Sequence, residues 1–140
     1  MPEKKIKHLE MIEAIIERMA KNCFQLKGWA MTLVALVGTL GTQGSEKKFM
    51  LLAFIPVIGF CFLDAFYLQQ ERKYKQLYKY VAEKDENDID FNMDTRLVTG
   101  NGDEMKRLRF CQCLFSISVI VFYGVIAVAM LSLFFVLKML

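Results

Sequence analysis

Charged residues are almost absent from three long stretches of this chain and are concentrated between them. Residues 110–137 contain no charge over 28 residues, residues 28–45 contain none, and residues 49–68 contain only Asp64. About 20 helical residues, each rising about 1.5 Å, cross a hydrocarbon core roughly 30 Å thick. The pattern therefore predicts an all-α membrane protein with three transmembrane helices, at residues 24–44, 49–68 and 110–137. A short loop makes the first two an antiparallel hairpin.

The polar segment before the first span, residues 1–23, has the repeat of an amphipathic helix. Its apolar positions recur every three or four residues, and charged residues occupy the other faces. The same register continues into the first span, which predicts one unbroken helix with Gly28 as the hinge if it bends. Two placements remain open for this helix: flat on the membrane surface, or bundled with residues 69–81. The repeating apolar residues are Leu9, Ile12, Ile16, Met19 and Cys23.

The segment between the second and third spans, residues 69–109, divides into a helix and an acidic loop. Helical periodicity continues past the second span through Tyr74 and Leu77, so that helix extends into the cytoplasm. Residues 83–103 are acidic and rich in turn formers. Within them, Ile89 and its apolar neighbours at every second position predict an extended stretch that docks either on the helices or on a partner.

The distribution of Lys and Arg predicts how the chain sits in the membrane. Six lie in residues 1–27 and nine in residues 69–109, against two in the hairpin loop and one near the C-terminus. By the positive-inside rule, the N-terminus and the segment 69–109 are cytoplasmic and the C-terminus is periplasmic. The N-terminal residues are too charged for a cleaved signal peptide, and we expect a single membrane domain over residues 1–140.

A line of small residues follows one face of the first span. In lipid, small side chains let helix backbones approach closely, and Thr hydroxyls can bond across the contact. This face is therefore the predicted helix-packing face, either inside the hairpin or between copies, where it would line a narrow polar path. The residues are Gly28, Thr32, Ala35, Thr39 and Thr42.

The second span contains two residues that weaken a helix. Pro56 lacks a backbone N–H and its ring clashes with the preceding turn, and Gly59 adds conformational freedom. Together they predict a hinge, with a kink near the middle of the bilayer.

Asp64 is the one acidic residue inside a predicted span, so it needs a partner or contact with water. Folding the hairpin about its loop brings Asp64 level with Trp29 and about one helical turn from Lys27. This geometry predicts an intramembrane ion pair between Lys27 and Asp64, with Trp29 as an interfacial anchor. The alternative is that Lys27 and Asp64 reach the lipid headgroups independently.

The chain lacks the residue patterns of catalysis and of metal binding. It has a single His, His8, and no nucleophile motif or phosphate-cradling glycine loop. The four cysteines lie in or beside the spans, where we read them as small buried thiols rather than as ligands or disulfides. We therefore expect no enzyme activity, no metal, no cofactor and no nucleic acid.

Two segments resemble known membrane proteins. FQLKGW at residues 24–29 and LDAFYLQQERKYKQLY at residues 63–78 resemble a family of small, uncharacterised bacterial inner-membrane proteins, over about the first 80 residues. The layout is also similar to the SLATT family, two-span proteins proposed to be membrane-perturbing effectors of nucleotide-triggered antiphage systems. The resemblance implies a bacterial inner-membrane location and a role in defence or stress, although the third span has no counterpart in the two-span plan.

Two functions are consistent with these features. In the first, copies assemble through the small-residue face, and a cytoplasmic protein or nucleotide signal opens a pore or leak. In the second, the chain is a membrane anchor or accessory subunit that recruits a soluble cytoplasmic partner. Both take the lipid bilayer as a partner, and the first requires a homo-oligomer.

Overall fold

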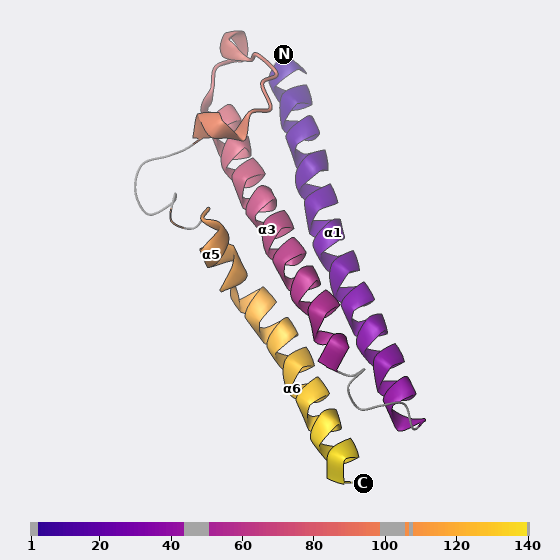
Figure 1. The fold of residues 1–140 in the computed structure, drawn as a ribbon. Coiled ribbons are helices and arrows are strands. Elements are labelled where there is room, and N and C mark those ends of the chain that lie inside the picture. The colour runs from indigo at the N-terminus through magenta and orange to yellow at the C-terminus, as the bar shows by residue number, and fades with distance from the viewer. Residues whose placement is uncertain (1–2, 44–50, 99–105, 107, 140) are drawn as a thin grey trace.

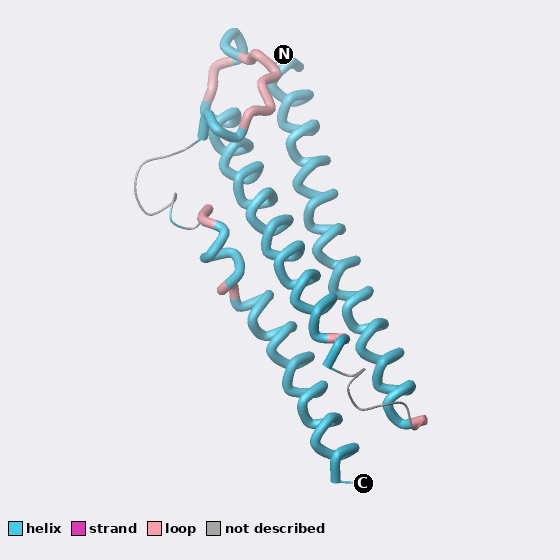
Figure 2. Tube along the Cα trace, in the orientation of Figure 1, coloured by secondary structure: helices cyan, strands magenta, loops and turns pink. Residues whose placement is uncertain are grey.

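The structure is a computed structural model that describes residues 3–43, 51–98, 106 and 108–139. Every regular element among these residues is helical. The long helices α1 and α3 lie side by side and antiparallel, and α6 packs along their lower part (Figure 1). Figure 2 shows the same path as helices joined by loops, with no strand in the described part. The elements are α1 (Glu3–Thr42), α3 (Phe54–Glu83), η1 (Glu86–Asp88), η2 (Thr95–Val98), α5 (Phe110–Leu114) and α6 (Ile117–Met139).

The N-terminal segment is a bundled helix and does not lie apart as a surface helix. It is part of α1, which runs unbroken through Gly28 into the apolar half of the chain. Ile12 of α1 packs against Leu77 and Val81 of α3 in an upper apolar cluster. This packing follows from the heptad-like spacing, since both helices present an apolar stripe at the same level. The residues around this core are Leu9, Ile16, Tyr74, Tyr78, Ile89, Met93 and Val98.

A lower apolar cluster joins all three long helices. Ala30 of α1, Val57 of α3 and Ile126 of α6 belong to it, together with Val119, Tyr123 and Met130. Small residues on α1 allow α6 to approach closely, and an added Cβ at Gly38 would lie 3.3 Å from Leu133 Cδ2. The lower half is therefore a three-helix bundle with an apolar core.

The helices α1 and α6 are the two in the described part that are long and apolar enough to cross a membrane. In the most apolar stretch of each, only 17% of the α1 residues and 22% of the α6 residues are buried within the molecule. The core helix of a water-soluble protein is buried along its apolar face. Apolar helices that are this exposed indicate a membrane location. The helix α3 is not in this set, because Asp64 interrupts its apolar part and polar residues follow Leu68.

The predicted third span, residues 110–137, is not one continuous helix. The structure divides it into α5 and α6, with Phe115 and Ser116 between them. Arg72 of α3 donates to Ser116 Oγ at 3.3 Å and to Cys113 Sγ at 3.6 Å, so the break coincides with a polar anchor. Absence of charge could not reveal this break, because the partner that holds it lies on another helix.

The helix in the second span is interrupted before the two residues of the predicted hinge. Leu51 and Leu52 are helical, Ala53 is a turn residue that keeps helical dihedral angles, and α3 begins at Phe54. Pro56 therefore lies in the first turn of α3, where a missing N–H costs little. Gly59 lies within the uninterrupted helix. The interruption falls near the hairpin loop and not in the middle of the span; residues 44–50 lie outside the described part.

The loop after α3 folds back on α1 and α3. Its apolar residues therefore dock on the helices of the same chain, the first of the two predicted alternatives. Ile89 and Met93 pack against the upper cluster. Glu86 Oε1 accepts a hydrogen bond from the Lys4 amide at 2.9 Å, placing a carboxylate at the N-terminus of α1, where the helix dipole favours negative charge. Lys5 Nζ donates to the Lys84 carbonyl oxygen at 2.8 Å. Residues 99–103 of this loop lie outside the described part.

Candidate functional site

The structure brings Lys27 and Asp64 into contact. Lys27 Nζ lies 2.6 Å from Asp64 Oδ2, with 20% of the Lys27 side chain and 1% of the Asp64 side chain exposed. The predicted ion pair is therefore present, and the alternative of two side chains reaching the headgroups independently does not describe this geometry. A buried carboxylate in an apolar bundle costs several kcal/mol unless it is paired, so this contact holds α1 and α3 in register.

The pair forms part of a polar layer between the upper and lower apolar clusters. Cys23 Sγ, one turn before Lys27, donates to the Asp64 carbonyl oxygen at 3.8 Å. Lys27 Nζ lies 5.8 Å from the centre of the Phe122 ring, a cation–π contact supplied by α6. The Tyr123 hydroxyl, also on α6, is buried. All three long helices therefore contribute to one layer.

The polar layer is only partly satisfied. Within the described chain, Asp64 Oδ1 and the Tyr123 hydroxyl are buried without a hydrogen-bond partner. Each buried group without a partner lowers the free energy of unfolding by about 1–3 kcal/mol, so the polar layer is less stable than a fully hydrogen-bonded one. Sequence reasoning overlooked Tyr123, although it is the one Tyr in the charge-free residues 110–137 and therefore a polar handle in an apolar span.

The predicted small-residue face does not form the helix contact within this chain. Every one of its five residues is exposed, and a Cβ added at Gly28 would meet nothing within 4 Å. The close approach occurs instead at Gly38, on another side of α1. The reading of this face as tight packing inside the hairpin is wrong, because α3 and α6 cover the side that carries Ala30, Val34 and Val37.

The hydroxyls on the exposed small-residue face bond to their own helix. Thr32 Oγ1 donates to the Gly28 carbonyl at 2.9 Å, and Thr39 Oγ1 and Thr42 Oγ1 donate to carbonyls of the preceding turn at 2.7 Å. Each hydrogen therefore points along the helix, and the oxygen lone pairs remain available on the surface. Trp29, the predicted interfacial anchor, lies beside this face and is 61% exposed.

The single histidine is buried at the other end of the molecule. His8 is 0% exposed, and neither ring nitrogen has a hydrogen-bond partner among the described residues. The Phe91 ring covers it at a centroid distance of 5.4 Å. Phe91 has a φ of 52°, in the left-handed region that residues other than Gly rarely adopt. The residue whose ring covers the imidazole therefore has a strained backbone conformation.

Neither a metal centre nor a disulfide is found in the part of the chain that the structure describes. It contains no group of three or more His, Cys, Asp or Glu side chains placed to hold a metal ion, and all four cysteines are free thiols. In the loop, the carboxylates of Asp90 and Asp94 accept bonds from Asn92 and Arg96, and these bonds lower the pKa of both.

Comparisons with protein-family models, with curated proteins and with solved structures find no match to this chain.

Proposed function

We propose that this chain is a three-span protein of the bacterial inner membrane that assembles into a homo-oligomer and lets cations leak across the bilayer. In this proposal α1, α3 and α6 all cross, with the N-terminus in the cytoplasm and the C-terminus in the periplasm. The paired charges let α3 cross despite Asp64, since an ion pair reduces the cost of a buried carboxylate. The resemblance of residues 24–29 and 63–78 to bacterial inner-membrane proteins supports the same location.

The observation that carries the proposal is the exposure of the small-residue face on α1. In the described part of the chain, Ala30, Val57 and Tyr123 pack together between the three long helices of one copy, so the proposed path for ions lies between copies. A face of Gly, Ala and Thr allows close contact between such copies. The outward lone pairs of Thr32, Thr39 and Thr42 would favour cations over anions along that path.

The test is regulated expression in bacteria loaded with a membrane-potential dye. The wild type should depolarise the cells, and Ala35→Leu combined with Thr39→Leu should abolish the effect by overfilling the contact. The matched control adds bulk at Leu36 and Leu40, which are also exposed on α1 but outside the face, by substituting Phe at both. Equal amounts of each variant in the membrane fraction are required for the comparison.

Two outcomes would contradict the proposal. If the wild type leaves the potential unchanged and copurifies with a soluble protein, the chain is a membrane anchor or accessory subunit. If the wild type depolarises cells and the double Leu variant does so equally, the small-residue face is not the assembly surface.

A further inference from the structure

An open pocket lies beside the junction of α3, η2 and α5, away from the paired charges. It has a volume of about 530 Å³. Gln69 Nε2 donates to the Leu108 carbonyl oxygen at 2.8 Å, and this bond fixes the chain entering α5 against α3. The residues that give the pocket its character are Gln69, Lys73, Thr95, Arg96, Arg109 and Phe110.

The pocket is basic. Lys73, Arg96 and Arg109 line it, and none of its lining residues carries a carboxylate. Arg96 Nε is held at 3.0 Å by Asp94 Oδ1, so its charge is partly balanced from outside the lining. Lys73 and Arg109 approach the pocket from two elements, α3 and the entry to α5. Cations from two sides of an open pocket suit a phosphate group.

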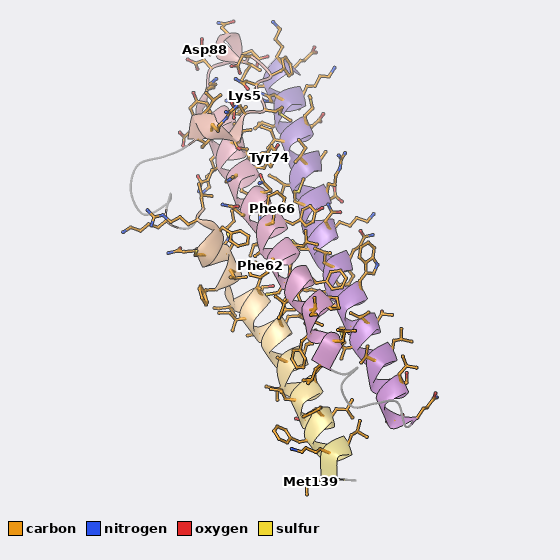
Figure 3. All side chains as sticks on the ribbon, viewed as in Figure 1. Lys5, Phe62, Phe66, Tyr74, Asp88 and Met139 are labelled. Carbon is orange, nitrogen blue, oxygen red and sulfur yellow. The ribbon has the colours of Figure 1, made fainter. Side chains whose placement is uncertain are left out.

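Exposed aromatic surface continues from the pocket toward the apolar half of α3. Phe62, Phe66, Gln69 and Lys73 are spaced four, three and four residues apart, so they lie along one stripe of the helix. Phe62 and Phe66 are exposed, and Figure 3 labels both on α3. Phe62 also stacks on Phe110 at a centroid distance of 6.1 Å, which connects the stripe to the floor of the pocket.

We propose that this pocket binds the headgroup of an anionic phospholipid from the cytoplasmic leaflet. The phosphate is held by Lys73 and Arg109, and the acyl chains run along Phe62 and Phe66. The aromatic stripe favours a lipid over a free phosphate, because a water-soluble ligand would gain nothing from it. The inference rests on the membrane topology proposed above, under which Leu68 marks the cytoplasmic boundary, but it does not depend on the leak.

The test uses the full chain in detergent, with bound lipid counted by native mass spectrometry. Phosphatidylglycerol should bind more tightly than phosphatidylcholine. Substituting Gln for both Lys73 and Arg109 should weaken phosphatidylglycerol binding about 25-fold, from about fivefold for each cation removed near a membrane surface. The matched control, Lys21→Gln with Lys79→Gln, removes the same charge from exposed positions outside the pocket lining and should change binding less than twofold.

A second variant separates the two sources of phosphate. Phe66→Ala should weaken phosphatidylglycerol binding without altering helical content, because the side chain is exposed. Inorganic phosphate at millimolar concentration should not displace the lipid. Displacement by inorganic phosphate, equal binding of the two lipids, or unchanged binding in the Lys73 and Arg109 variant would each overturn the lipid site. Because binding is measured without ion flux, loss of the leak with retained lipid binding would contradict only the proposed function.

Discussion

At the scale of single residues, the buried side chains of His8 on α1 and Asp64 on α3 differ in whether they have a partner. Asp64 is paired with Lys27 across the helix interface, whereas His8 is buried beneath Phe91 without a hydrogen-bond partner in the described part of the chain. A paired charge can stabilise a helix contact, but an unpaired buried donor and acceptor cost free energy. The two sites therefore predict mutational effects of opposite sign.

The ion pair predicts thermodynamic coupling between Lys27 and Asp64. Asp64→Asn and Lys27→Gln should couple by about 0.5–2 kcal/mol in a double-mutant cycle on unfolding in detergent, the range of polar couplings within membranes. Lys21→Gln is the matched control, because Lys21 is exposed on the same helix and should combine additively with Asp64→Asn. Additive behaviour of Lys27 and Asp64 would mean that their proximity contributes no net stability.

The buried imidazole predicts a substitution that does not destabilise the protein. His8→Leu replaces an unsatisfied polar ring with an apolar side chain in an apolar site, so the free energy of unfolding should be unchanged or rise by about 1 kcal/mol. Leu9→Ala serves as the comparison, since it removes apolar packing from the same cluster and should lower stability. A loss of more than about 1 kcal/mol on His8→Leu would show that the imidazole has a stabilising partner.

At the scale of elements, the helices could be predicted from the sequence, but their contacts only in part. The register of α1 against α3 followed from apolar spacing and hairpin geometry, which placed Asp64 level with Trp29 and about one helical turn from Lys27. Which face of α1 is covered depends on where α6 packs, and no feature of α1 alone encodes that position. The interruption at Ala53 depends on the backbone N–H that Pro56 lacks. The break at Ser116 coincides with a hydrogen bond from Arg72, which lies on another helix.

The position of α6 predicts different responses at two glycines of α1. Gly38→Leu should destabilise the bundle by about 1–3 kcal/mol, because a Cβ there already meets Leu133 and a larger side chain overfills the contact. For separate copies in dilute detergent, Gly28→Leu should be neutral or slightly stabilising, because its Cβ would meet nothing within the chain and Leu is the better helix former. Thermal unfolding of both variants in dilute detergent measures the difference. The reverse order of stability would place α6 on the other side of α1.

At the scale of the whole molecule, the exposed apolar surface and the charge distribution point to the same arrangement. The N-terminus and the C-terminus lie at opposite ends of the bundle (Figure 1), as an odd number of crossings requires. Basic residues gather at the N-terminal end, where the loop after α3 and the exposed charged faces of α1 and α3 form a polar cap around the upper cluster. The lower bundle presents apolar side chains outward, which suits lipid and not water. The proposed leak and the lipid site both depend on this orientation.

The proposed arrangement of three spans with a cytoplasmic N-terminus is tested most directly by measuring the membrane topology. The measurement uses a reporter that is active only in the periplasm. Fused after Leu140, the reporter should be active, because three crossings from a cytoplasmic N-terminus bring the C-terminus outside. Fused after Asn92, at comparable expression, it should be silent, because two crossings return the chain to the cytoplasm. Activity at Asn92 with silence after Leu140 would contradict three crossings from a cytoplasmic N-terminus, the cytoplasmic position of the polar cap and the leaflet assigned to the lipid site.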